Sequence, residues 1–451
     1  MYHSVCFSLI AISTFCGPAV FADPKSEDRN PKTYSLQELI SLAIEDNGTI
    51  TEGRWRVRGA TARLDEAKAA GILPKLRLES SSGLVPDAEG DIFNPPSDTS
   101  GLRPVGAFNR TELQFVQPLF TFGYLRSLQD AASAGIEVQK SSLAGNEVAL
   151  GLQVKELYYG LLTAQDLAEM VERLINELQE HQSSVSFDNP SIPLSGPYKL
   201  QLALFELKRR HHQALNQVIL AQSALTWTVG LPEDTPLRLQ AEWLEPVNTQ
   251  IPELDTLFGL AVLHRPDWRK LRAGIAAKQA LHDAAKKAFL PQVYLAGGIR
   301  YAIAPNRTDQ HNPFVKDDFN YFNAGVFIGL RQSFEWGLLT ADVNRARAEL
   351  YELRAAEASA TQSIRLDIKR AFLAYQQAEV ELDLTREGRR VTREWLRTAK
   401  DEYELDPEQI KELVSAFEAF AQTEESYYQA MYKFNLTIAR LEQTVGVTYS
   451  F

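Results

Sequence analysis

A helical pattern changes into a strand pattern at a proline twice in this chain, and this repeated change restricts the possible folds more than any other feature. In AGILPKLRLESSSG, which contains Pro74, apolar residues at helical spacing give way to leucines that alternate with charged residues. The segment KAFLPQVYLAGGIR repeats the change at Pro291. Each of these helices is therefore expected to lead into a strand.

Other segments also occur twice, in one order and with nearly constant spacing. LISLA corresponds to LFGLA, LFTFG to SFEWG, and VKELYYGLLTAQ to IKRAFLAYQQAE. A proline-rich stretch separates the two sets, and this pattern predicts an internal duplication. The predicted parts are a signal peptide in residues 1–22, a first structural repeat in 23–230, a linker in 231–253 and a second repeat in 254–451.

The first 22 residues are uncharged apart from His3, are mostly apolar and end in Ala22. This pattern favours export, although the usual lysine or arginine near the start is missing, and the alternative is a buried terminal strand or helix. Both cysteines, Cys6 and Cys16, lie in this segment. An exported mature chain would therefore have no disulfide and no thiolate metal site.

Two very long helices are predicted from apolar residues that follow each other at steps of four and three. The first is expected from about Phe122 to about Phe187, and the second from about Leu338 to about Leu405. At 1.5 Å per residue, roughly 65 residues span about 100 Å, and the shorter helices of each repeat add up to a similar length. Each repeat is therefore predicted to be an antiparallel coiled coil with a strand hairpin at one end.

The four predicted strands have one apolar face each and are long enough to cross a bilayer when tilted. A soluble sheet would show the same alternation, but the location of the strands at one end of a long rod, behind an export signal, favours the membrane. Four strands cannot close a barrel, so several copies must share one, and three copies would give twelve strands and a wide lumen. The candidate lipid-facing residues are Leu76, Leu78, Leu113, Phe115, Val293, Leu295, Phe322, Val326, Ile328 and Leu330.

Taken together, these segments resemble the outer-membrane efflux proteins of Gram-negative bacteria, the TolC family. The resemblance covers nearly the whole mature chain through LQELISLAIEDNGTI, ARLDEAKAAGILPKL, LQFVQPLFTFG, VKELYYGLLTAQ and LTWTVGLP. It implies a homotrimer with a twelve-stranded β-barrel in the outer membrane and a periplasmic α-helical tunnel. It also implies the function of an exit duct in a tripartite efflux or type I secretion system, with a periplasmic adaptor (membrane fusion) protein and an inner-membrane transporter as partners.

A non-channel periplasmic or surface coiled-coil scaffold or adaptor is the alternative function. The chain shows no catalytic, phosphate-binding or dinucleotide motif, so neither an enzyme nor a cofactor is expected. The net charge of −11 argues against a nucleic-acid partner. His211 and His212 are neighbours on a predicted helix and point in different directions, so they do not share a face as a metal-binding pair would. His211 lies in the apolar seam, where packing against another helix is expected rather than metal binding.

Candidate gate residues lie at the ends of the coiled coils that are remote from the strands. Asp188 lies near the first of these ends, and Asp401 and Asp406 lie near the second. In a trimer each aspartate would occur three times, and an inward-facing ring of carboxylates attracts cations. The other interpretation of each residue is a solvated loop.

Overall fold

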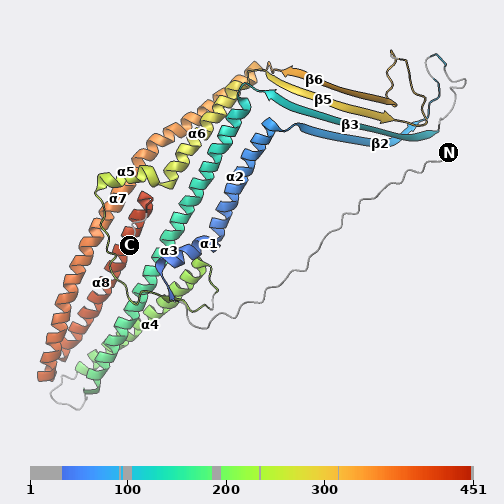
Figure 1. Ribbon diagram of the computed structural model, residues 1–451. Coiled ribbons are helices and arrows are strands. Elements are labelled where there is room, and N and C mark those ends of the chain that lie inside the picture. The colour runs from blue at the N-terminus through green and yellow to red at the C-terminus, as the bar shows by residue number, and fades with distance from the viewer. Residues whose placement is uncertain are drawn as a thin grey trace.

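The computed structural model shows a long helical rod with a β-sheet at one end (Figure 1). The signal peptide predicted in residues 1–22 and the candidate Asp188 lie outside the part of the chain that the structure describes. The described residues are 33–90, 93–94, 104–184, 195–232, 235–312 and 314–447.

The two halves of the chain have the same order of main elements. The first half consists of α1 (Leu36–Asp46), α2 (Gly48–Ile72), β2 (Lys75–Pro86), β3 (Val105–Phe120), α3 (Tyr124–Ser184) and α4 (Gly196–Val229). The second consists of α5 (Leu254–His264), α6 (Pro266–Lys287), β5 (Gln292–Ile303), β6 (Tyr321–Arg331), α7 (Trp336–Leu405), the 3-10 turn η1 (Pro407–Gln409) and α8 (Ile410–Val445). The predicted fold class, mostly helical with four strands, is confirmed for the single chain.

The rod is built around α3 and α7, which contain 61 and 70 residues. Helices α2 and α4 both pack along α3, and α8 packs along α7. The two halves are joined because α6 contacts both long helices and α8 contacts α3. The apolar seam predicted in the first long helix lies in the core, where Val154, Leu161 and Leu178 are almost completely buried.

The helix predicted before Pro74 follows a separate short helix, so this part of the chain consists of two helices, α1 and α2. The chain turns at Asn47, whose backbone is extended and whose side-chain oxygen accepts a hydrogen bond from the Thr49 N–H at 2.9 Å. Asn47 therefore ends α1 and caps α2. In the second half, Pro266 starts α6 immediately after α5. The two short helices, α1 and α5, lie across the middle of the rod (Figure 1).

The linker between the two halves is bound to the rod at its centre. The carboxylate of Asp166 in α3 accepts a hydrogen bond from the Leu244 N–H at 2.8 Å. The side chain of Asn435 in α8 accepts one from the Val247 N–H and donates one to the Glu245 carbonyl. A short parallel pair of strands, β1 (Thr33–Tyr34) and β4 (Arg238–Leu239), attaches the linker to the start of the first half.

The binding of the linker predicts a pH-dependent stability. Burial raises the pKa of Asp166 from 3.8 to about 6, although the hydrogen bond from Leu244 opposes this shift. The folded chain therefore holds this proton more tightly than the unfolded chain does, and its stability decreases as the pH rises through this window. Asp166→Asn should remove the decrease, so its melting midpoint relative to that of the wild type should rise between pH 4 and pH 7.

Circular dichroism melts of the protein in detergent can measure this difference. The control is Glu137→Gln, because Glu137 is exposed, pairs with Lys140 on the same helix and does not contribute to the pKa shift of Asp166. A constant difference between Asp166→Asn and the wild type over the whole range would show that Asp166 does not cause the pH dependence.

The four long strands form one antiparallel sheet in the order β2-β3-β5-β6. The first hairpin is thus paired to the second, and β2 and β6 remain as edges. A bulge interrupts the pairing between Pro118 and Phe120, near the end of β3 that leads into α3. None of the helices among the described residues is apolar and long enough to cross a membrane.

Candidate functional site

The ten predicted lipid-facing residues lie on one face of the sheet. Residues that pair directly in antiparallel strands have their side chains on the same face. Leu76 pairs with Phe115, and Leu78 with Leu113. The same face continues through β5 and β6, where Val293 pairs with Leu330 and Leu295 with Ile328, and Phe322 and Val326 alternate with residues of the other face. That this face contacts lipid remains a prediction.

The opposite face of the sheet carries all the charged residues of the four strands, each of which the structure describes completely. In the middle of the sheet Glu79 lies directly opposite Glu112 on the neighbouring strand, and Glu112 lies directly opposite Arg300 on its other side. The complete set of charged strand residues is Lys75, Arg77, Glu79, Arg110, Glu112, Arg300 and Arg331. The face with the ten apolar residues therefore has no charged side chain, although it includes the polar Ser80, Ser82, Asn109 and Thr111, and the other face carries all the charges of the strands. This distribution suits a wall between lipid and water.

Aromatic residues gather where the strands meet the helices. The rings of Phe120 and Phe122 lie 4.6 Å apart, and Trp336 lies within 6 Å of Phe289 and Phe334. Four of the five rings are exposed, and exposed aromatic girdles are typical of the two membrane–water boundaries of a barrel. The sequence analysis had used LFTFG and SFEWG only as landmarks of the repeat, although their aromatic residues could have indicated this boundary.

The turn from β3 into α3 depends on a left-handed backbone at two successive residues. Phe122 has φ 51° and Gly123 has φ 81°, which a glycine adopts readily and a phenylalanine does not. The Lys287 ammonium, at the end of α6, donates a hydrogen bond to the Ser127 hydroxyl at 2.8 Å and lies 3.5 Å from the Gly123 carbonyl oxygen. The second half of the chain thereby stabilises the helix–strand turn of the first half.

The hairpin loops at the other end of the sheet are joined to each other. The Thr308 N–H donates to the Ala88 carbonyl at 3.0 Å, and the Gly90 N–H donates to the Thr308 hydroxyl at 3.2 Å. The side chain of Gln310 donates to the Gly90 carbonyl. These contacts connect the β2–β3 loop to the β5–β6 loop.

The two described gate candidates differ in their surroundings at the tip between α7 and α8. Asp401 is exposed on the last turns of α7. Asp406 is also exposed, but its carboxylate accepts hydrogen bonds from the Glu408 N–H at 3.0 Å and from the Gln409 side chain at 3.3 Å. Asp406 thus caps the turn η1 and has a structural function that the sequence analysis had not predicted.

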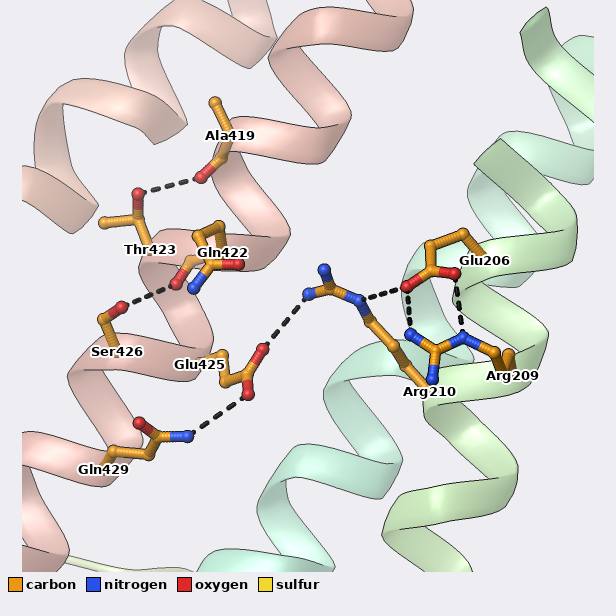
Figure 2. Close-up of polar contacts among 9 residues, drawn as sticks. All are labelled: Glu206, Arg209, Arg210, Ala419, Gln422, Thr423, Glu425, Ser426 and Gln429. Atoms are coloured by element: carbon orange, nitrogen blue, oxygen red, sulfur yellow. Dashed lines mark hydrogen bonds and ion pairs between the residues drawn. The ribbon is translucent and has the colours of Figure 1, made fainter. Parts of the chain in front are cut away.

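Ion pairs connect the two helical hairpins near this tip. Figure 2 shows Arg210 of α4 between Glu206, on its own helix, and Glu425 of α8, whose carboxylate lies 3.1 Å from the guanidinium. Lys400 of α7 pairs with Glu177 of α3. These contacts hold the α7–α8 hairpin against the α3–α4 hairpin. Local sequence patterns do not predict these two pairs, because the partners lie more than 200 residues apart.

A buried ion pair joins α3 to α8 nearer the middle of the rod. Lys155 of α3 pairs with Glu442 of α8, and both side chains are more than nine-tenths buried. Burial, together with the nearby Glu442 carboxylate, raises the pKa of Tyr159. A second buried carboxylate, Glu424, pairs with Arg389 at 2.6 Å and with Arg393 at 3.3 Å between α7 and α8.

The two neighbouring histidines differ in their exposure. His211 is half-buried and His212 is exposed, and their ring centroids lie 6.3 Å apart. Within the described ranges, no group of three or more histidine, cysteine, aspartate or glutamate residues could hold a metal ion.

Comparison with known proteins identifies one family and several similar folds. The family model described as "Outer membrane efflux protein" matches residues 39–186 and 257–447. The MtrE outer membrane channel of Neisseria gonorrhoeae, in its open state, is 20% identical, with a TM-score of 0.72 and coverage of 91% of this chain and 89% of MtrE. The CmeC outer membrane channel of Campylobacter jejuni is 16% identical, with a TM-score of 0.72 and coverage of 91% and 85%. The outer membrane protein VceC of Vibrio cholerae is 16% identical, with a TM-score of 0.71 and coverage of 92% and 97%. A comparison with curated protein sequences finds no match.

Proposed function

Because the chain belongs to the outer membrane efflux protein family, we propose that it is the exit duct of a tripartite efflux or type I secretion system. The observation that carries this proposal is the two-faced sheet at the end of the rod. Its apolar face has the composition of a lipid-facing surface, and its other face suits a water-filled lumen. An inner-membrane transporter would supply the energy through a periplasmic adaptor, and the duct itself would perform no covalent chemistry.

The open edges of the sheet support a homotrimer. Strands β2 and β6 have no partner on their outer sides within the described chain, and unpaired backbone groups are not tolerated in hydrocarbon. Pairing β6 of one copy with β2 of the next would satisfy both edges, and three copies would close a barrel of twelve strands. In this arrangement each proposed repeat, 23–230 and 254–451, contributes one hairpin per copy.

The proposal is tested by two properties of the purified protein. In mild detergent it should form a trimer whose migration on an unheated gel changes on boiling, and in a planar lipid bilayer it should conduct ions. A monomeric, non-conducting protein that is soluble without detergent would instead support the coiled-coil scaffold.

We further propose that the tip remote from the sheet is the gate and that the ion pairs between the two hairpins keep it closed. Replacing Arg210 and Lys400 together by methionine should increase the open probability of the channel and hence its average conductance, because the two ion pairs that join α7–α8 to α3–α4 near the tip are then lost. Each partly exposed pair contributes about 0–1 kcal/mol, so a roughly two- to tenfold rise in open probability is expected.

A matched control for this experiment is Arg209→Met. Arg209 pairs with Glu206 within α4 and makes no ion pair across the hairpins among the described residues. It should leave the conductance unchanged. Equal effects of Arg209→Met and the double variant would contradict the proposed closing contacts. Asp401→Asn tests the candidate carboxylate ring at the same tip and should lower the ratio of potassium to chloride permeability of the open channel relative to the wild type.

A further inference from the structure

The charged face of the sheet has a sign opposite to that of the whole chain. The four strands contain five basic and two acidic residues, which is a net of three positive charges, while the chain as a whole has a net charge of −11. The register places all seven side chains on the same face. The proposed barrel would therefore have a basic inner wall inside an acidic protein.

Three of the five basic residues lie in the rows of this face that are nearest to the helices. Lys75 is the first residue of β2, Arg77 follows on the same face, and Arg331 is the last residue of β6. The two carboxylates, Glu79 and Glu112, lie farther from the helices and oppose each other directly. The rows of this face from the helices up to Arg77 therefore carry three cations and no carboxylate in these fully described strands, and Glu79, Glu112 and Arg300 form the next charged row.

Most of these basic groups are not neutralised by neighbouring carboxylates. Within the described residues the one ion pair of this wall joins Arg77 to Glu79 at 3.5 Å, and both side chains are mostly exposed. The Arg331 guanidinium lies over the Tyr294 ring, 5.0 Å from its centroid, and Glu112 accepts a hydrogen bond from Gln114 at 2.6 Å. Exposed pairs of this kind leave much of the field of the basic groups intact.

Closure of the proposed barrel would bring these cations closer together. Lys75 and Arg331 lie at the same end of the two edge strands, β2 and β6, and these edges meet in the trimer. Like charges on adjacent strands repel each other, so anions in the lumen would stabilise the closed barrel. Three copies would repeat this cluster around the inner wall.

The lumen is narrow enough for this charge to act across it. Twelve strands about 4.8 Å apart and tilted by about 40° give a backbone radius of roughly 12 Å. Side chains project inward from this wall, and the Debye length at physiological ionic strength is about 8 Å. The potential of the wall therefore reaches the axis of the lumen.

We propose that the barrel segment selects for anions, so that the exported solutes carry carboxylate, sulfate or phosphate groups. This inference rests on the proposed duct function, because it needs the shared barrel. Low-dielectric walls lined by charges of one sign raise the local concentration of counter-ions. The five basic side chains of the wall then determine the specificity of the duct, and the transporter supplies the driving force.

The test is the reversal potential of the reconstituted channel in a gradient of potassium chloride. In Lys75→Gln/Arg77→Gln/Arg331→Gln the ratio of chloride to potassium permeability should fall by roughly threefold or more. Glu112→Gln should shift the ratio in the opposite direction. The control is Lys316→Gln, because Lys316 lies in the β5–β6 loop, is highly exposed and pairs with Asp318.

The outcomes separate this inference from the proposed function. A wild-type protein that forms no channel contradicts the duct function itself. A conducting channel whose permeability ratio is the same in the wild type and in the triple variant contradicts the anion-selective wall. If the triple variant does not assemble, Arg331→Gln alone and Glu112→Gln must shift the ratio in opposite directions, and equal ratios overturn the inference.

Discussion

Val326→Arg is expected to abolish assembly of the protein in the outer membrane. Val326 is the middle residue of the 11-residue strand β6, lies on the apolar face and is exposed in the single chain. An arginine on the lipid face near the middle of the bilayer costs about 2–4 kcal/mol, and the cost arises once in each copy of a trimer. The heat-modifiable trimer should therefore disappear from outer-membrane fractions.

A charge of the same kind on the other face should be tolerated. Asn323 lies on the same strand, on the charged face, where it pairs with Arg300. Asn323→Arg should therefore assemble and conduct. Normal assembly of Val326→Arg would mean that the apolar face does not contact lipid. It would then favour the alternative function, a coiled-coil scaffold that forms no channel.

Lys155→Met is expected to cause the largest loss of stability within the helical rod. The substitution leaves the Glu442 carboxylate buried between α3 and α8 without its lysine. Breaking a buried ion pair from one side typically costs about 3–5 kcal/mol. Melts followed by circular dichroism in detergent should show a clear decrease in the midpoint.

The double variant Lys155→Met/Glu442→Leu distinguishes the ion pair from simple packing. When both charges are replaced by apolar groups, most of the lost stability should return. An exposed pair provides the control, because Lys140 and Glu137 lie one turn apart on α3 at 2.9 Å, and Lys140→Met should cost less than about 1 kcal/mol. A double variant as unstable as the single variant would mean that shape, not charge, matters at this place.

The features predicted correctly from the sequence depend on local periodicity. The steps of four and three along α3 and the alternation along β6 fix which residues face inward, and both patterns can be counted in a single segment. For this reason the long helices, the four strands and the common face of the ten apolar residues could be predicted before the pairing was known.

The features that were missed depend on contacts between distant segments or on a single residue. Asn47 separates α1 from α2 through one side-chain hydrogen bond, which a periodic pattern does not show. Glu425 meets Arg210 only because two hairpins from different halves pack together. The capping function of Asp406 was hidden because the same residue type suits both a charged ring and a turn.

The joined hairpin loops hold the two hairpins together at the end of the sheet that is remote from the helices. Hydrogen bonds between the Ala88–Gly90 segment and the residues Thr308 and Gln310 join the hairpin of one half to that of the other. In the proposed barrel the two hairpins of one copy would therefore move together, and a change in the width of the proposed duct would come from tilting of the helices. A small tilt of the helices where they meet the sheet would then move the distant helical tip over a much larger distance.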